Sequence, residues 1–332
     1  MKITKLSVPS VLAMSLLAGC VTDPGDELGS EDSAMAETTG EAVSQAADEV
    51  LDARSAVAAE HKDLSALTSQ PMGLTTWYSG AVAPGATQHW VWNNAPATLV
   101  FTAGASPVGA TTASPCDFEI TRSWDVQQYG GEREFHFDLK NVGSITCGAN
   151  VLLDSMPRIN SFSTSGIAAG AAKSFTWNNA SPGAFFANVN PSGATSGSPC
   201  ALEVTRTWYV QQPGGEREFR LTVQNVGAIA CQGDVNLGLT TAANSSWSTA
   251  ALSPGASQGW TWNNANPLDR IYVPGLSPLG ASGLTPCALE VTRQYYRQVL
   301  NTTGSTEREF HFDVKNVGTL ACYGTVLLDY MN

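Results

Sequence analysis

The chain has 332 residues, of which 43% are hydrophobic and 14% charged, and its formal net charge is −12 at pH 7. Almost all of the acidic excess lies between Val21 and Asp63, where 12 acidic residues accompany two basic ones, whereas Leu64–Asn332 carries 17 acidic and 13 basic residues. Neither part has the basic patch or Lys/Arg run on which nucleic-acid binding depends. We therefore expect no nucleic-acid partner.

The first residues have the pattern of an export signal. Two lysines precede an apolar stretch, Leu6–Leu17, which is too short to span a bilayer as a mature helix, and small residues lead up to Cys20. The sequence LAGC (Leu17–Cys20) resembles the lipobox of bacterial lipoproteins, in which the cysteine becomes the lipidated first residue after cleavage. An ordinary signal peptide with an incidental cysteine is the alternative.

The lipobox resemblance implies a location. Residues 1–19 would be removed as a signal peptide, and Cys20 would carry the lipid that anchors the protein to a membrane. Val21 follows this cysteine where an aspartate would favour retention in the inner membrane, so the resemblance implies delivery to the outer membrane or cell surface in a host with two membranes.

Residues 20–73 differ in composition from the rest of the chain. They are rich in Ala, Glu, Asp, Ser and Thr, and they offer too little hydrophobic surface to offset the conformational entropy lost on folding. We expect this segment to be a disordered acidic tether between the anchor and the folded part.

The remainder of the sequence repeats with a period of 85 residues. The sequence WNNA occurs at Trp92–Ala95, Trp177–Ala180 and Trp262–Ala265, and a second block that runs from PC through EREF to NVG also occurs three times. Self-similarity at a fixed period indicates tandem copies of one structural unit. We predict three domains, at residues 74–156, 157–240 and 241–332.

Each copy has the period of a β-strand. In the first copy, alternation predicts that Phe118, Ile120, Arg122, Trp124 and Val126 share one face, and the alternation resumes after a Gly-rich turn in EFHFDLK. The NVG sequence is a second turn, and no segment has the pattern of a convincing helix. The sequence therefore predicts an all-β fold of three tandem Ig-like antiparallel β-sandwich repeats of about 85 residues, after the disordered tether.

The end of the second hairpin strand carries a family resemblance. KNVG at the end of EFHFDLK resembles the Ig-like adhesion-type modules of bacterial exported proteins, whose late strands often end in a valine-rich NxG turn. The resemblance covers about a third of each copy and implies a sandwich fold. The paired cysteines described next are not part of that family's usual pattern.

The seven cysteines divide into Cys20 and two in each copy. The two members of each pair are 31, 31 and 35 residues apart, and the extra residues of the third copy fall in its hairpin turn. A metal site is the rival interpretation, but no further Cys or His stands at ligand spacing. In an oxidising compartment we predict one disulfide in each copy. The predicted pairs are Cys116–Cys147, Cys200–Cys231 and Cys287–Cys322.

No residues assemble into a catalytic centre. The matching histidines His136 and His311 are replaced by Arg220 in the middle copy, and His89 is matched by Ser174 and by a glycine. A nucleophile would need a positioned base, and the common nucleophile, zinc and phosphate-binding motifs are missing from the sequence. We predict that the protein is not an enzyme and that it has no cofactor and no metal.

Charged side chains are expected to pair across the strands. Hairpin register places Glu119 opposite Lys140 and Glu290 opposite Lys315, and in the middle copy Gln224 stands beside Glu203. Three arginines fall on the predicted apolar face, where they would pair with a glutamate of GERE at the sandwich edge or contact a ligand. These arginines are Arg122, Arg206 and Arg293, and the glutamates are Glu132, Glu216 and Glu307.

The repeated WNNA sequence has two interpretations. The tryptophans can fill the interior while the asparagines form the turn that leaves the strand. Alternatively, an exposed Trp ring and two adjacent amides form a sugar-binding platform, present three times for avidity. The candidate ligand-binding residues are Trp92, Asn93, Asn94, Trp177, Asn178, Asn179, Trp262, Asn263 and Asn264.

Together these patterns predict a non-enzymatic cell-surface binding or adhesion lipoprotein, with a surface polysaccharide as its ligand. The alternative is a structural spacer or envelope-assembly protein that binds other protein chains through sheet edges. A third hypothesis is an inhibitor or docking factor for an exported enzyme, acting through loops such as Val299–Thr306.

Overall fold

The computed structural model describes residues 60–63 (backbone only), 73–240, 245–266 and 270–331. The predicted signal peptide, Cys20 and most of the predicted tether lie outside these residues. All regular structure in the described part of the chain is β-strand, as the sequence predicts. Within the same residues there is no helix of the length and apolarity needed to cross a membrane.

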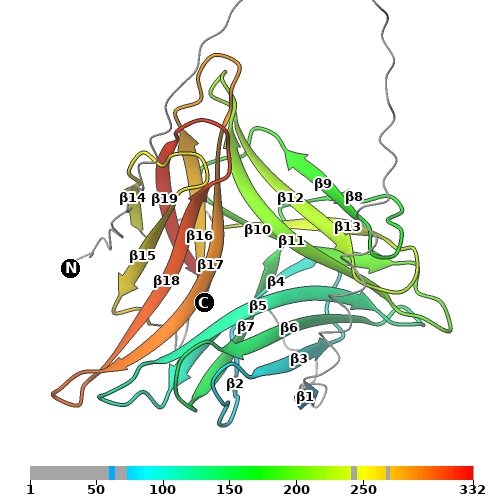
Figure 1. Cartoon of the computed structure of the whole chain (residues 1–332). Helices are drawn as coiled ribbons and strands as arrows, with labels where there is room; N and C mark the ends of the chain where they lie inside the picture. Colours follow the sequence, from blue (N-terminus) through cyan, green and yellow to red (C-terminus); the bar gives the residue numbers. More distant parts are fainter. Residues whose placement is uncertain (1–59, 64–72, 241–244, 267–269, 332) are drawn as a thin grey trace, which may run out of the picture. The chain divides into compact units, whose positions relative to one another are not determined.

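The strands follow one another in three sets that correspond to the three sequence copies (Figure 1). After β1 (Glu60–Asp63), the first set is β2 (Thr75–Tyr78), β3 (Thr87–Asn93), β4 (Leu99–Val108), β5 (Cys116–Gln127), β6 (Arg133–Asn141) and β7 (Gly148–Pro157). The second set is β8 (Asn160–Ser163), β9 (Ala172–Trp177), β10 (Ala184–Ser192), β11 (Cys200–Gln211), β12 (Arg217–Asn225) and β13 (Gln232–Thr240). The third set is β14 (Ser245–Ser248), β15 (Ser257–Asn263), β16 (Ile271–Leu279), β17 (Cys287–Leu300), β18 (Thr306–Asn316) and β19 (Tyr323–Met331).

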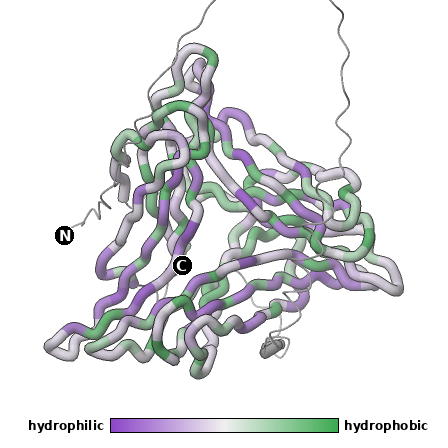
Figure 2. Tube along the Cα trace, in the orientation of Figure 1, coloured by the Kyte–Doolittle hydropathy of each residue, from purple (hydrophilic) through white to green (hydrophobic). Residues whose placement is uncertain are grey.

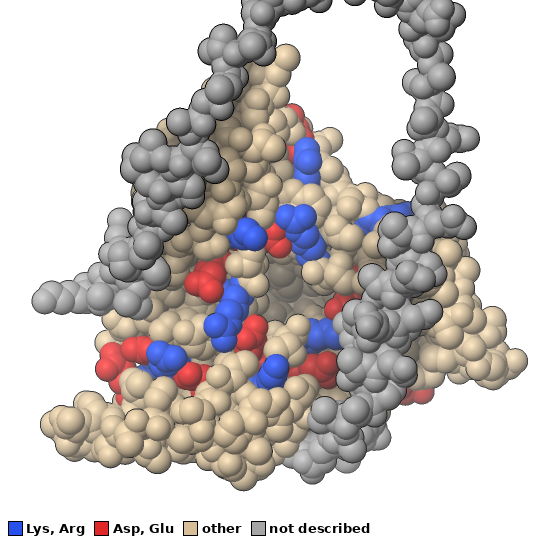
Figure 3. Space-filling model, in the orientation of Figure 1, with Lys and Arg blue, Asp and Glu red and all other residues tan. Residues whose placement is uncertain are grey.

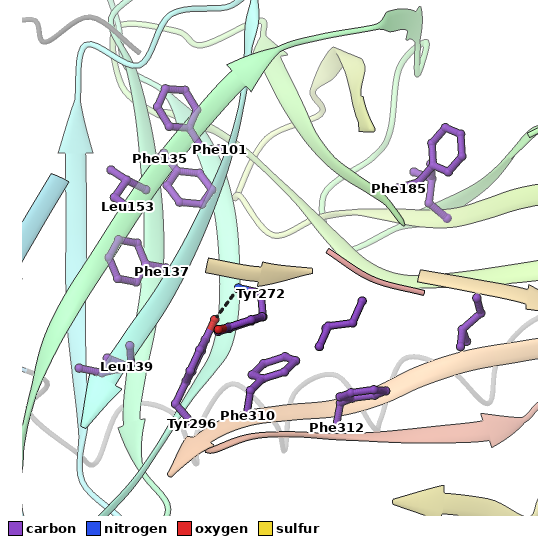
Figure 4. Packing of buried hydrophobic residues seen from close by; sticks show 14 of the residues in the cluster. Phe101, Phe135, Phe137, Leu139, Leu153, Phe185, Tyr272, Tyr296, Phe310 and Phe312 are labelled. Carbon is purple, nitrogen blue, oxygen red and sulfur yellow. Dashed lines mark hydrogen bonds between the residues drawn. The ribbon is translucent and has the colours of Figure 1, made fainter. Parts of the chain in front are cut away.

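Each set is divided between two antiparallel sheets. In the first set β3, β6 and β5 are neighbours in the large sheet, while β2, β7 and β4 form a separate three-stranded sheet, and the other two sets divide in the same way. The hydrophobic core lies between them. In the first set, Phe135, Phe137 and Leu139 on β6 face Phe101 on β4 and Leu153 on β7 (Figure 4), and all five side chains are buried. The fold is therefore sandwich-like.

Strands β5, β11 and β17 connect the three sets. The last residues of β5 pair with the first residues of β11, β11 pairs in the same way with β17, and the last residues of β17 pair back to the first residues of β5. Each of these three pairings between copies, called a link below, is antiparallel, and at one end of it a glutamine opposes a cysteine. The opposed pairs are Gln127–Cys200, Gln211–Cys287 and Gln298–Cys116.

A β-bulge in each of these strands reverses the predicted orientation of the arginines. The pairing register of β5 with β6 shifts between Ile120 and Arg122, which leaves Thr121 as the extra residue, and β11 and β17 shift at the same position. Because an extra residue moves the following side chains to the opposite face, Ile120 faces the core whereas Arg122 and Trp124 face outward with Glu119. Polar and apolar residues alternate along the long strands in Figure 2.

The NVG turn has the same structural role in each of the three copies. Asn141 is fully buried, and its Nδ2 donates to the carbonyl oxygens of Val82 and Ile145, while its Oδ1 accepts from the Gly143 N–H. A Cβ at Gly143 would lie 3.1 Å from the Asp117 nitrogen, so a larger residue in the turn would crowd the neighbouring backbone. Asn225 and Asn316 make the same bonds in the other copies.

One short strand falls in the segment predicted to be a tether. Strand β1 pairs with β3 in parallel, from Glu60 opposite Gln88 to Asp63 opposite Val91. The outer edge of β3 would otherwise present unpaired backbone N–H and C=O groups, which gives a physical reason for an added strand.

The predicted disulfides are confirmed. Cys116–Cys147, Cys200–Cys231 and Cys287–Cys322 are bonded, with Cα atoms 6.1, 5.7 and 5.6 Å apart. In each bond one cysteine begins the strand that connects the sets, and the other is the residue just before the central strand of the smaller sheet. Every cysteine involved is buried.

We expect removal of one disulfide to lower the free energy of unfolding without changing the fold. Replacing Cys200 and Cys231 with alanine reopens a loop with a sequence separation of 31 residues, which costs about 3–4 kcal/mol on the loop-entropy model. Urea unfolding followed by circular dichroism would measure the loss, with the reduced and alkylated wild type for comparison. A variant as stable as the oxidised wild type would contradict the expectation.

Candidate functional site

The tryptophans of WNNA lie in or against the core. Trp92 is 8% exposed, and Trp177 and Trp262 are partly buried and packed against the core residues. The Trp92 ring centroid is 5.8 Å from that of Trp77, and the Trp262 centroid is 5.3 Å from that of Trp247. These contacts support the interpretation that the rings fill the interior.

The remaining residues of WNNA form a turn. The second asparagine has a left-handed backbone in all three copies, with φ of 56° at Asn94, 52° at Asn179 and 52° at Asn264. Asparagine tolerates this conformation better than most residues. The alanine that follows is buried, and its N–H donates to the carbonyl of the arginine in ERE, as from Ala95 to Arg133.

The outward face of β5, β11 and β17 carries the most organised group of polar side chains in the described part of the chain; we call it the polar face. On it, the arginine of each copy bonds the glutamate of the next copy rather than a glutamate of its own GERE, so the sequence-based prediction of the partners is wrong. The bulge is the reason, because it places the arginines beside the neighbouring strand. The pairs are Arg122–Glu203 at 2.7 Å, Arg206–Glu290 at 2.6 Å and Arg293–Glu119 at 3.2 Å.

The predicted register of the glutamates within each hairpin is confirmed. Glu119 opposes Lys140 and Glu290 opposes Lys315, while Glu203 opposes Gln224. The short ion pairs of these glutamates nevertheless run to arginines of another copy. Figure 3 shows the result, in which Lys and Arg lie among Asp and Glu across one face. The polar face has no large area of a single sign.

Each arginine of the polar face also covers an aromatic ring of its own strand. The guanidinium carbons of Arg122, Arg206 and Arg293 lie 4.3–4.7 Å from the ring centroids of Trp124, Trp208 and Tyr295. Such cation–π contacts contribute about 0.5–1 kcal/mol at exposed sites. They help to hold each arginine where its Nε donates to the glutamate.

In the first copy the ring of Trp124 also stacks on two histidines. Its centroid is 4.9 Å from that of His89 on β3 and 5.2 Å from that of His136 on β6. In the third copy the equivalent Tyr295 stacks on His311, at 4.6 Å and an interplanar angle of 7°. These rings are already covered by arginine and histidine side chains. A ligand of the polar face would therefore contact its hydrogen-bonding groups more than the faces of its aromatic rings.

The link between the third and first copies differs from the other two. Arg297 on β17 bonds Asp117 on β5 through Nε and Nη2, at 2.8 and 3.0 Å. The bond to the carboxylate raises the pKa of Arg297. At the equivalent positions the other two links have only apolar side chains. These are Val126 opposite Ala201 and Val210 opposite Ala288.

Glutamines close every link in the same way. Gln127 Oε1 accepts the backbone N–H groups of Gly193 and Ala194, and Gln298 Oε1 accepts those of Gly109 and Ala110. Gln211 makes the corresponding bond to the N–H of Ala281. The turn that follows β4, β10 or β16 is therefore held by a glutamine of another copy. The first copy holds the turn of the second, the second that of the third, and the third that of the first.

A buried carboxyl group marks the link between the first and second copies. Asp125 is 8% exposed and stands where the other copies have Tyr209 and Tyr296. Its Oδ2 accepts the Val189 N–H at 3.0 Å, and it lines a small pocket with Asn188. Burial raises the pKa of Asp125 well above 3.8, and the bond from Val189 offsets only part of this effect.

Sequence reasoning missed the polar face because it assigned Arg122, Trp124 and their equivalents to the core. The available signal was an arginine between Ile120 and Trp124 at a position that strict alternation makes apolar. A charged residue at such a position is a reason to expect a bulge. The pairing between copies had no signal in the sequence.

Comparisons with protein-family models, with curated proteins and with solved structures found no match to this chain.

We expect the Arg297–Asp117 pair to be replaceable by the apolar pair of the other links. Asp117→Ala alone leaves a half-buried guanidinium without its partner and should cost about 1–3 kcal/mol. Adding Arg297→Val reproduces Val126 opposite Ala201 and should restore most of that loss. Chemical unfolding of both single variants and the double variant measures the coupling; additive losses would contradict the expected compensation.

We expect Asp125→Asn to stabilise the protein at neutral pH. The raised pKa of Asp125 means that its ionisation opposes folding, so the penalty is absent below 3.8, grows as the pH rises from 3.8 to the folded-state pKa and is constant above it. The amide keeps an acceptor for the Val189 N–H but carries no charge. Melting temperatures of both proteins between pH 3 and 8 should converge in acid and separate near neutrality; a constant difference would contradict this reasoning.

Proposed function

We propose that this chain is an exported, lipid-anchored, non-enzymatic binding protein of a bacterial cell surface. Its folded part would be three Ig-like sandwich repeats, and the acidic segment after Cys20 would hold them away from the outer membrane. The observation that carries the proposal is the polar face, on which a group of arginine, glutamate and aromatic ring occurs three times in equivalent positions.

The chemistry of the polar face favours a neutral, hydroxyl-rich polymer as the ligand. Its arginines and glutamates are paired one to one, so neither a polyanion nor a polycation meets a field of opposite sign. The guanidinium groups of Arg122, Arg206 and Arg293 have N–H groups beyond those that bond the glutamates, and these can donate to hydroxyl groups. Three weak sites on one chain would bind a repeating glycan more tightly than one site.

A second candidate function is the assembly of envelope proteins by strand addition. Strands β9 and β15 occupy the place that β3 has in the first set, and in the described residues neither has a strand on its outer edge. On β3 that edge pairs with β1. An extended segment of another protein could add to β9 or β15 by the same backbone hydrogen bonds.

The first function is tested by sedimentation of the full-length protein with insoluble neutral polysaccharides, and with a sulfated polysaccharide as the charged comparison. The triple variant Arg122→Lys, Arg206→Lys and Arg293→Lys keeps the charges but loses the planar donors. We expect it to be retained about tenfold less well by a neutral polysaccharide than the wild type, because three weakened sites reduce avidity.

The matched control is the set Trp92→Phe, Trp177→Phe and Trp262→Phe. These variants change the WNNA rings, which lie in or against the core, and should retain wild-type binding once their folding is confirmed by circular dichroism. If only the tryptophan variants lose binding, the platform interpretation of WNNA is correct and the polar face is not the site. If no polysaccharide is retained by the wild type, the glycan proposal fails.

A further inference from the structure

A chain of four hydrogen-bonded side chains lies at the border of the polar face, on β3 and β6 only. His89 Nδ1 is 2.9 Å from Asp138 Oδ1, His89 Nε2 is 3.0 Å from His136 Nδ1, and His136 Nε2 is 2.9 Å from Glu134 Oε2. The glycan proposal does not use this group. The order along the chain is carboxylate, imidazole, imidazole, carboxylate.

The order of these groups leaves two ring nitrogens facing each other. Each carboxylate can only accept, so His89 donates from Nδ1 to Asp138 and His136 donates from Nε2 to Glu134. In neutral rings the remaining nitrogens, Nε2 of His89 and Nδ1 of His136, both carry lone pairs. Two lone pairs 3.0 Å apart repel each other, so either one ring carries an additional proton or a cation lies beside both nitrogens.

We propose that His89 and His136 bind one divalent transition-metal ion of the zinc type. A histidine ligand commonly donates its second ring N–H to a carboxylate, which fixes the ring and strengthens the other nitrogen as a ligand. Both histidines here have such a carboxylate, Asp138 or Glu134. The two carboxylates together carry the charge that balances a divalent ion.

The distances need only a small adjustment. Zinc lies about 2.0–2.1 Å from a histidine nitrogen, so two nitrogens at the tetrahedral angle are about 3.3–3.4 Å apart. The present separation is 3.0 Å, and the rings would have to part by a few tenths of an ångström. The side chains of His89 and His136 are 16% and 12% exposed, which leaves a path for the ion from solvent.

Two protein ligands leave the remaining coordination positions to water or to a bound molecule. Among the described residues no group of three or more His, Cys, Asp or Glu side chains is arranged to hold a metal ion. The site would therefore be an open one. Trp124, stacked on both imidazoles, limits how far they can turn.

The other two copies show that the fold does not need the second imidazole. In the second copy Ser174 and Arg220 stand at these positions, and Arg220 bonds Glu218. In the third copy a glycine replaces His89, and the hydroxyl of Thr261 lies 3.0 Å from Nδ1 of His311. These residues are replacements that the same strand positions already accept.

The test is isothermal titration of the full-length protein with zinc chloride, after dialysis against a chelator, together with the melting temperature with and without zinc. We expect one equivalent to bind and to raise the melting temperature, whereas magnesium should have no effect because it prefers oxygen ligands. His89→Ser, which copies Ser174, should weaken zinc binding at least tenfold and abolish the thermal shift. Asp138→Asn should weaken binding about 10–100-fold.

His311→Arg, which copies Arg220 in the third copy, is the matched control and should bind zinc as the wild type does. All of these variants keep His61, so binding there would appear in every titration. Absence of a zinc-induced shift in the folded wild type would overturn the proposal and leave a shared proton between the imidazoles. Binding that persists in His89→Ser would also overturn it.

Discussion

The structure depends on how three long strands satisfy their exposed edges. One edge of β5, β11 or β17 is fully paired within its own hairpin, and the other edge would be left with a row of free N–H and C=O groups. Each strand divides that edge between two neighbours, the first residues pairing with one copy and the last residues with another. Three copies close this series, and the pairings between copies cover both ends of that edge in each strand, while the middle residues 119–123, 204–208 and 290–295 are not part of them.

The bulge converts this backbone pairing into a polar surface. With regular alternation the arginines would enter the core, where an unpaired charge is costly. One extra residue turns them outward and places each beside a glutamate of the next copy, over an aromatic ring of its own strand. Most of the stability still comes from the cores between the sheets, because partly exposed ion pairs each contribute little. Their main effect is on the orientation of side chains on the polar face.

The copies are equivalent in backbone but not in chemistry. The link from the third copy to the first contains Arg297 and Asp117, the link from the first to the second contains the buried carboxyl of Asp125, and only the first copy has two adjacent histidines. The repeated sequence folds into three similar backbones, and single substitutions give each copy its own polar group.

The sequence by itself determined the features that depend on local pattern. Alternation predicted the strands, the cysteine spacing predicted the three disulfides, and hairpin register placed Glu119 opposite Lys140. The signal peptide, the lipid on Cys20 and the acidic tether remain predictions. These inferences work because side-chain period, turn chemistry and loop length are properties of neighbouring residues.

Only the tertiary structure decided which surface the polar residues form. The bulge at Thr121 changes the face of every residue that follows in β5, and period-2 reasoning assumes that no such residue exists. The partners of Arg122 and Asp125 lie in the second copy, on strands whose pairing depends on the packing of whole sheets. WNNA could be read as core or as binding platform because a repeated structural residue and a repeated ligand contact look the same in sequence. The contact of Trp92 with Trp77 supports the first interpretation, since burial is a property of the folded chain.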